Sequence, residues 1–481
     1  MRIAISLFLV TAAVYLFSTG AHAYSVDETT NYASARAFVQ TGSPDLRSQI
    51  DNPFPSTRLL KVEHPDQPRI TGRYGLLAWL SMVPAYAAAS AFGPVPEPVG
   101  PAFPQGGDIL PLAGLLFNPL IGATLVALIY LLARSVALSR WHSLAAAVIA
   151  GFASPIWVYS STLSSIPLAT TLIIAALLAL ARGRQRHQIA LALSSGLLAG
   201  LAAATRPDFI LFAPILLIAA FAIRPQPVGA AVARAALWAV GWAIVVVPGV
   251  GFYNLYRTGD VLNFGYSEQT FLWATDRAHI GLFGILASSG FGLFVYFPLG
   301  ILGLWGLLTG GGVRWLRWTM AAATLMAIFL YGTFNDWEGG VSWGPRYLTS
   351  IVPLLAIGVG CLLAGPRVSL PARLAEAFLA VWGAAVSVLG ILFDYQRGWQ
   401  NLWDVGARPD QIIWDPHFSP IGAHLRLLRQ WLDGLIEPDF YLAQKLGVWT
   451  VPALIGVLAV ILMGTVAALA RARLSAAIRP G

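Results

Sequence analysis

The chain has 481 residues, of which 57% are hydrophobic and only 11% charged, whereas a soluble domain carries about 25% charged residues. A soluble globule has no way to hide so much apolar surface, so this composition excludes a soluble enzyme or a nucleic-acid-binding protein. The positive charge is almost entirely arginine, because Lys61 and Lys445 are the only lysines. A single cysteine, Cys361, excludes an internal disulfide. The sequence therefore predicts a polytopic membrane protein.

Hydrophobic runs indicate how often the chain crosses the membrane. A spanning helix needs about 20 mostly apolar residues, and runs of this kind predict about twelve spans. They lie near residues 3–23, 111–133, 141–159, 163–181, 188–204, 207–223, 235–253, 283–308, 318–334, 347–365, 374–393 and 450–470. The expected fold is an all-α bundle of about 12 transmembrane helices with interfacial helices on the outer side.

The arginines decide on which side each loop lies, because cytoplasmic loops are enriched in Arg and Lys. If the short apolar stretch 76–92 does not cross and the N-terminus is cytoplasmic, 15 arginines lie inside with Glu376 as the only acid, and the other 21 acids lie outside. We therefore predict that residues 76–92 form a re-entrant or interfacial helix on the outer face. The functional loops are then expected to face the periplasm or cell exterior, from a multi-pass protein of the inner (plasma) membrane.

The first apolar run allows two interpretations. Ala21-His22-Ala23 has the pattern of a signal-peptide cleavage site, but the lone Arg2 and the length of the run favour a retained span. Either way, residue 24 onward lies outside.

Organisation along the chain follows from these loops. We expect a transmembrane core over residues 1–395, with a first outer loop at 24–110. An outer segment follows at 394–449, and a last span with a basic cytoplasmic tail occupies 450–481.

The first outer loop begins with two adjacent carboxylates, Asp27 and Glu28, in a short amphipathic helix that Gly42 is expected to end. Three explanations stay open for the pair: one is a general base, both hold a divalent cation, or both are ordinary first-turn charges favoured by the helix dipole. Asp27 is the preferred base, because it is expected at the mouth of a membrane-embedded cavity.

The densest group of site-like residues lies in the loop 335–347. Its glycines allow close backbone approach, and Trp337, Trp343 and Tyr347 offer flat faces against which a substrate packs. Arg346 stands at the outer end of a span, where its guanidinium can bind a phosphate through two hydrogen bonds. The alternative is an interfacial aromatic belt with a snorkelling arginine; the combination of glycines, acids and WGPR favours a site.

Further arginines lie close to the predicted outer surface. Arg206 either binds phosphate or pairs with Asp208 to cap a tight turn. Arg69 and Arg73 either meet an anionic headgroup or are ordinary lipid-surface arginines. Tyr266 is a further candidate for lining the same cavity.

Motifs for metal or nucleotide chemistry are absent from the sequence. No pair of histidines has zinc-ligand spacing, and there is no P-loop or dinucleotide fingerprint. We expect no cofactor, with a divalent cation at Asp27 and Glu28 as the less favoured alternative.

Taken in order along residues 1–395, these motifs resemble the GT-C superfamily of integral membrane glycosyltransferases. The likeness is greatest to its family 39-like branch, which includes protein O-mannosyltransferases and bacterial aminoarabinose transferases. The motifs that carry it are the following: Asp27-Glu28, the apolar stretch entered at Gly72, Ser154-Pro155, Tyr159-Ser160, Thr205-Arg206-Pro207, Phe264-Gly265-Tyr266 and Trp343-Gly344-Pro345-Arg346-Tyr347.

The resemblance implies transfer of a sugar from a polyprenyl-phosphate donor to a glycan, lipid or protein acceptor. It implies that Asp27, beside Glu28, is the general base, and that Arg346 and Arg206 bind the donor phosphate. One departure stands out, because the family often has a further acid in the second outer loop, where residues 160–167 offer hydroxyls instead. The alternative function is a transporter or flippase of a lipid-linked saccharide.

Overall fold

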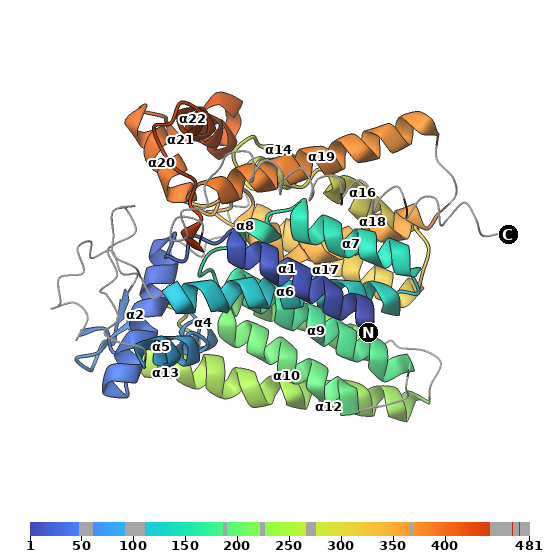
Figure 1. The fold of residues 1–481 in the computed structure, drawn as a ribbon. Coiled ribbons are helices and arrows are strands. Elements are labelled where there is room, and N and C mark those ends of the chain that lie inside the picture. The colour runs from blue at the N-terminus through green and yellow to red at the C-terminus, as the bar shows by residue number, and fades with distance from the viewer. Residues whose placement is uncertain are drawn as a thin grey trace. The chain divides into compact units, whose positions relative to one another are not determined.

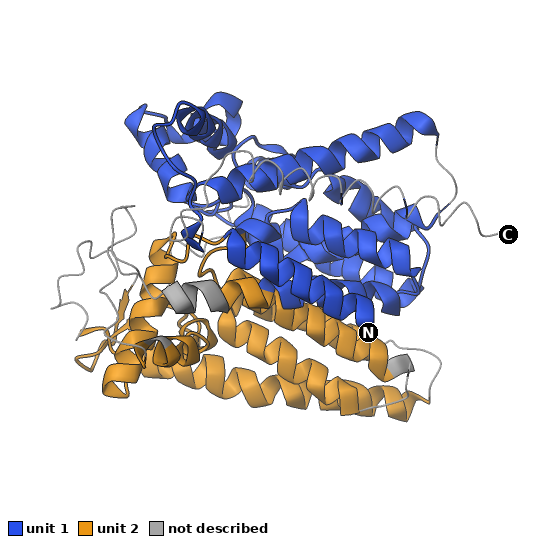
Figure 2. Ribbon diagram, viewed as in Figure 1, with its two compact units in different colours: residues 1–18, 122–158, 272–481 blue, residues 19–121, 159–271 orange. Residues whose placement is uncertain are grey.

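A computed structural model describes residues 1–47, 61–91, 111–185, 190–221, 227–265, 276–365 and 369–442, together with residues 464 and 471. The chain forms two compact units (Figure 2). Unit 1 comprises Met1–Ser18, Gly122–Val158 and Leu272–Gly481, and unit 2 comprises Thr19–Ile121 and Tyr159–Phe271.

Helices build almost all of unit 1 (Figure 1). They are α1 (Arg2–Phe17), α7 (Arg140–Phe152), α14 (Ala278–Ala287), α15 (Leu293–Tyr296), α16 (Leu299–Thr309), α17 (Arg314–Gly332), η4 (Arg346–Ile351), α18 (Val352–Leu363), α19 (Leu370–Leu392), α20 (Tyr395–Asp404), α21 (Pro409–Trp414), η5 (Pro416–Phe418) and α22 (Pro420–Leu432). Two more, α6 (Pro111–Ser135) and α8 (Ile156–Ser160), contribute to both units.

Unit 2 combines apolar helices with a small hairpin. Its elements are α2 (Val26–Thr41), β1 (Lys61–Glu63), β2 (Ile70–Gly72), α4 (Leu76–Leu80), α5 (Val83–Ser90), α9 (Ile166–Gln185), α10 (Ala190–Thr205), η1 (Pro207–Phe212), α11 (Ala213–Phe221), α12 (Val228–Val246), η2 (Val247–Phe252) and α13 (Tyr253–Thr258). The two strands pair antiparallel, with Val62 opposite Thr71.

The predicted all-α membrane fold is confirmed, although its spans are less regular than expected. Among the described residues, five helices are long and apolar enough to cross a bilayer. They are Phe117–Ser135, Ile166–Gly183, Val228–Thr258, Arg346–Leu363 and Leu370–Leu392. The other described runs form shorter apolar helices, and the predicted span 450–470 lies outside the described residues apart from residue 464.

Three of the predicted spans were wrong. The run 141–159 is not one helix but α7 and α8, because residues 153–155, which include Pro155, interrupt it. The run 283–308 is not one helix but α14, α15 and α16, because Ser288–Gly292 and Pro298 interrupt it. The first run ends at Phe17 rather than at residue 23. The described part of the stretch 76–92 forms two short helices, α4 and α5, which have five and eight residues. At 1.5 Å per residue, neither helix reaches across the hydrocarbon core.

Hydrogen bonds group the loops of unit 1 as the arginines predict. The amide of Val313 donates to the carbonyl of Val136 over 2.8 Å, so two predicted inner loops meet, and the amide of Gly311 donates to the carbonyl of Cys361, near the end of α18, over 3.3 Å. At the opposite ends of these helices, Trp399 Nε1 donates to Ser342 O over 3.1 Å, which joins two predicted outer segments.

Unit 2 shows the same grouping. On the predicted inner side, Arg234 Nε donates to Ala220 O over 2.6 Å. On the predicted outer side, Gly75 approaches the turn after α10 so closely that a Cβ there would lie 2.5 Å from Ala204 O and 2.6 Å from Thr205 O. Within each unit, segments that the arginines assign to one side therefore lie next to one another, whereas the side of the membrane on which each group lies stays a prediction.

This topology makes a labelling prediction. Cysteines placed at Gly311, where a side chain meets no neighbour within 4 Å, and at the exposed Asn335 should react with a membrane-impermeant maleimide from opposite sides. We expect Gly311→Cys to label only from the cytoplasm and Asn335→Cys only from outside, in a Cys361→Ser background. Labelling of both from one side would mean that the helix between them does not cross, and the scheme would fail.

Candidate active site

Asp27 lies in the first turn of α2, half-buried, with a tyrosine hydroxyl on its carboxylate. The helix begins where predicted, because the Ser25 side chain caps it by accepting a hydrogen bond from the amide of Glu28. Gly42 ends it in the left-handed conformation, at φ +74°. The hydroxyl of Tyr74 donates to Asp27 Oδ1 over 2.5 Å, a short charge-assisted bond that fixes the orientation of the carboxylate.

Glu28 is only 1% exposed and is held entirely differently. Its Oε2 accepts hydrogen bonds from the amide of Tyr24 over 2.7 Å and from that of Leu163 over 3.2 Å. Burial raises the pKa of Glu28 to about 7, although the backbone hydrogen bonds and the Thr162 side chain act in the opposite direction. Glu28 thus ties the first turn of α2 to the hydroxyl-rich turn 160–165.

The far side of that turn is held by Asn118 of α6. Its Nδ2 donates to Thr162 O over 2.5 Å and to Ser164 O over 2.7 Å. Because the side chains of Glu28 and Asn118 bind its backbone from two sides, the turn provides a rigid support for Glu28 and, through α2, for Asp27.

The raised pKa of Glu28 makes a stability prediction. The folded protein holds a proton on Glu28 that the unfolded chain loses at lower pH, so this residue destabilises the fold increasingly as pH rises from about 4.5 to above 7. Glu28→Gln keeps an acceptor oxygen for both amides, so the variant should melt higher than the parent at pH 8 and close to it at pH 5. Thermal unfolding across this range checks the prediction, which a lower melting temperature of Glu28→Gln at pH 8 would contradict.

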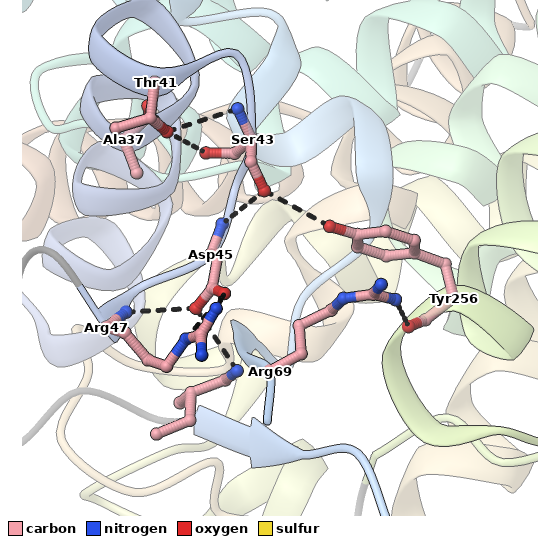
Figure 3. A network of polar contacts seen from close by, with 8 residues as sticks. Ala37, Thr41, Ser43, Asp45, Arg47, Arg69 and Tyr256 are labelled. Carbon is pink, nitrogen blue, oxygen red and sulfur yellow. Dashed lines mark hydrogen bonds and ion pairs between the residues drawn. The ribbon is translucent and has the colours of Figure 1, made fainter. Parts of the chain in front are cut away.

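The arginine predicted at position 69 is engaged by the protein itself. Arg69 Nη1 donates to Tyr256 O over 2.8 Å, and its guanidinium lies 3.9 Å from the centre of the Tyr256 ring (Figure 3). In the same view, Asp45 accepts from Arg47 and from the amide of Ile70. These contacts attach the loop after α2 and the hairpin to α13.

Arg257 of α13, which sequence reasoning missed, also attaches the hairpin to α13, through the strand β2. It is 1% exposed, and it donates to Gly72 O over 3.2 Å and to Asn254 Oδ1 over 2.6 Å. The signal available in the sequence was an arginine shortly after the predicted span 235–253, where a charge near the hydrocarbon needs a partner. Because Gly72 directly precedes Arg73 and Tyr74, Arg257 fixes the segment that reaches Asp27.

The remaining arginines of unit 2 have different surroundings. Arg73 is half-buried, 5.9 Å from the ring centre of Tyr74. Arg206 forms an ion pair with Asp208 over 3.1 Å. This is the pair expected if Arg206 caps the tight turn between the two apolar runs. Its role in phosphate binding stays a prediction.

Arg346 in unit 1 packs against a glycine and a tyrosine. Gly339 has φ +75°, and a Cβ there would lie 2.9 Å from both Cγ and Nε of Arg346. The guanidinium lies 5.0 Å from the Tyr347 ring centre, and Nη2 donates to the Tyr347 hydroxyl over 3.3 Å. The Tyr347 ring stacks on Tyr331 at 5.1 Å. The absence of a side chain at Gly339 leaves room for Arg346. The stack on Tyr331 fixes Tyr347, whose hydroxyl accepts the hydrogen bond from Arg346.

The two tryptophans of this loop differ. Trp343 has no exposed surface and packs on Tyr296 and His424, with ring centres 5.4 and 4.4 Å away. This placement is that of a core residue of unit 1. Trp337 is half-buried and covers Gly284, where a Cβ would lie 2.2 Å from its ring.

The predicted site residues thus fall into two groups. Unit 2 holds Asp27 and Glu28 with Tyr74, together with Arg69, Arg73 and Arg206; unit 1 holds Arg346, Tyr347, Trp337 and Trp343. The predicted Tyr266 lies outside the described residues. Within the described ranges, no three His, Cys, Asp or Glu side chains are gathered as a metal site would need.

Comparison with known proteins gives structural relatives alone, since no protein-family model and no curated protein matches the chain. ArnT from Cupriavidus metallidurans, bound to undecaprenyl phosphate, matches with a TM-score of 0.53 and 16% identity over 98% of this chain and 77% of that chain. Its apo state matches equally well. The Archaeoglobus fulgidus oligosaccharyltransferase, tethered to an acceptor peptide, matches 87% of this chain and 59% of its own, with a TM-score of 0.46 and 13% identity.

The likeness to ArnT extends over nearly the whole chain, and it bears out the resemblance that the sequence motifs suggested. ArnT is an aminoarabinose transferase of the GT-C superfamily. At 16% identity, the comparison establishes the fold. The chain is therefore a multi-pass membrane protein with a GT-C-like fold.

Proposed function

We propose that the protein is a membrane glycosyltransferase that moves a sugar from a polyprenyl-phosphate carrier to an acceptor on the outer face of the membrane. The observation that carries the proposal is the Asp27 carboxylate, oriented by Tyr74 over 2.5 Å, within a fold shared over 98% of the chain with a protein that binds undecaprenyl phosphate. The acceptor is a glycan, lipid or protein, and no cofactor is required.

The chemistry assigns separate tasks to the two groups of residues. Attack by an acceptor hydroxyl or amine needs a base within hydrogen-bond reach, which Asp27 supplies. Departure of the carrier phosphate develops negative charge that a fixed arginine stabilises, which we assign to Arg346, with Arg73 and Arg206 as further candidates. Glu28 and Arg69 hold the site together in this scheme, since the protein already occupies their polar atoms.

Substrate contacts are placed on the half-buried Tyr347 and Trp337 rather than on the fully buried Trp343. An aromatic side chain needs an open face to pack against a sugar, and Trp343 has no exposed surface. The predicted orientation places these residues in the periplasm or cell exterior, where no nucleotide-sugar is needed because the carrier lipid delivers the donor.

Mass spectrometry of cell-surface glycans and lipids, with and without the protein, tests the proposal. Cells that carry the protein should contain a glycosylated species that is absent from the deletion strain and from a strain with Asp27→Asn. Purified protein in nanodiscs should then transfer the same sugar from its polyprenyl-phosphate donor. A flippase would instead move the donor without forming a product, and that result would replace this proposal with the transport alternative.

A further inference from the structure

We propose that Trp414, at the end of α21, is an interfacial anchor that docks the outer segment of unit 1 onto the lipid bilayer. The partner is the boundary zone between headgroups and acyl chains, on the side of the membrane where residues 394–442 lie. The inference begins from α14, which packs beside it.

α14 exposes apolar side chains on one face. Ile280 is 42% exposed and Phe283 is 62% exposed, in a ten-residue helix whose one ionisable side chain is His279, exposed at its start. In a membrane protein such a face contacts lipid. The Trp414 ring stacks on Phe283, with ring centres 5.9 Å apart and planes inclined by 19°. Trp414 therefore continues the apolar surface of α14 at Phe283.

Backbone contacts fix α21 in this place. The amide of Gly290 and the hydroxyl of Ser289 both donate to Ile413 O over 3.1 Å. A Cβ at Gly290 would lie 2.3 Å from Ile412 O, so glycine is needed for the close approach. The anchor is thus attached to the break between α14 and α15 at the residue just before Trp414.

The chemistry of the anchor suits a membrane interface rather than water or hydrocarbon. Trp414 remains 41% exposed despite its contacts, and tryptophan concentrates at headgroup level, where its ring is apolar and its N–H is polar. The charged Asp410 precedes it by one helical turn, and Asp415 follows it. Polar flanks around an exposed indole are typical of a segment that lies on a bilayer.

The anchor also reaches the loop that carries Arg346. Trp337 lies 6.4 Å from Trp414 between ring centres, and this loop continues to Gly339, against which Arg346 packs. Trp414 therefore links the lipid-facing end of α14 to the Arg346 loop. This link rests on the proposed function. In that function Trp414 would hold Arg346, the arginine assigned to the carrier phosphate, at the plane of the donor headgroup.

Electron paramagnetic resonance measures the depth directly. A nitroxide on Trp414→Cys, in a Cys361→Ser background in phosphatidylcholine nanodiscs, should collide more with oxygen than with a water-soluble nickel chelate, as expected about 5–10 Å into the interface. A label on Asp404→Cys, in the exposed part of α20, is the matched control and should favour the chelate. Chelate access at position 414 equal to the control, or dipolar broadening from a second copy, would overturn the anchor.

A second measurement covers the case in which Trp414→Cys does not fold. Acyl-chain-brominated phosphatidylcholine should quench less of the total tryptophan fluorescence in Trp414→Phe than in the parent, and equal quenching would contradict the anchor.

For the functional link, Trp414→Ser should weaken binding of long-chain polyprenyl phosphate in nanodiscs by roughly tenfold, while a short water-soluble isoprenyl phosphate binds as before. Unchanged long-chain binding overturns that link, whereas absence of transfer by the parent overturns the proposed function and leaves the depth measurement intact.

Discussion

Asp27→Asn should lower the turnover of sugar transfer by about 10²–10⁴-fold, the usual contribution of a general base. The amide keeps the shape of the carboxylate, and its oxygen still accepts the Tyr74 hydroxyl that lies 2.5 Å from Asp27. Donor affinity should change little, because the arginines that we assign to the phosphate are untouched. Steady-state turnover and donor binding, measured on the same nanodisc preparation, check the expectation.

Two further variants make this experiment specific. Asp66→Asn alters an exposed carboxylate of the same outer loop and should leave turnover as in the parent. Tyr74→Phe should lower turnover by less than Asp27→Asn, and adding it to Asp27→Asn should cost little more, because the hydroxyl acts through the carboxylate. Near-normal turnover in a folded Asp27→Asn protein would remove Asp27 as the base and move the assignment to the exposed Asp336.

Arg346→Ala should weaken binding of the polyprenyl-phosphate headgroup by about 10- to 150-fold, the equivalent of about 1.5–3 kcal/mol for hydrogen bonds to a charged group. Arg346→Lys should recover only part of this loss, because it keeps the charge but loses the planar pair of donors. The comparison separates the two explanations of the loop, since a lysine would serve as well as arginine in a mere interfacial anchor.

Binding of undecaprenyl phosphate in nanodiscs is the measurement for Arg346. Arg408→Ala provides the control, because this exposed arginine of the outer segment pairs with Asp410 instead. If Arg346→Ala binds the headgroup as tightly as the parent, Arg346 belongs to the aromatic belt, and the phosphate site lies at Arg206 or Arg73.

The sequence alone was sufficient for the all-α membrane class and for which loops lie together, although not for the length and continuity of each span. Hydrophobic runs and arginines encode these directly, because a span must be apolar along its length and basic residues mark its inner end. The first turn of α2 was equally readable, since Ser25 and Gly42 are local capping signals that require no distant contact.

Only the tertiary structure decided what each candidate side chain touches. Adjacent carboxylates look alike in a sequence, yet Asp27 meets a tyrosine hydroxyl, whereas Glu28 is buried against the amides of Tyr24 and Leu163. Arg69 is bound to a carbonyl 187 residues away. Trp343 is a core side chain, because Tyr296 and His424 arrive from distant segments to cover it. Such partners are set by long-range packing, which neither periodicity nor motif spacing records.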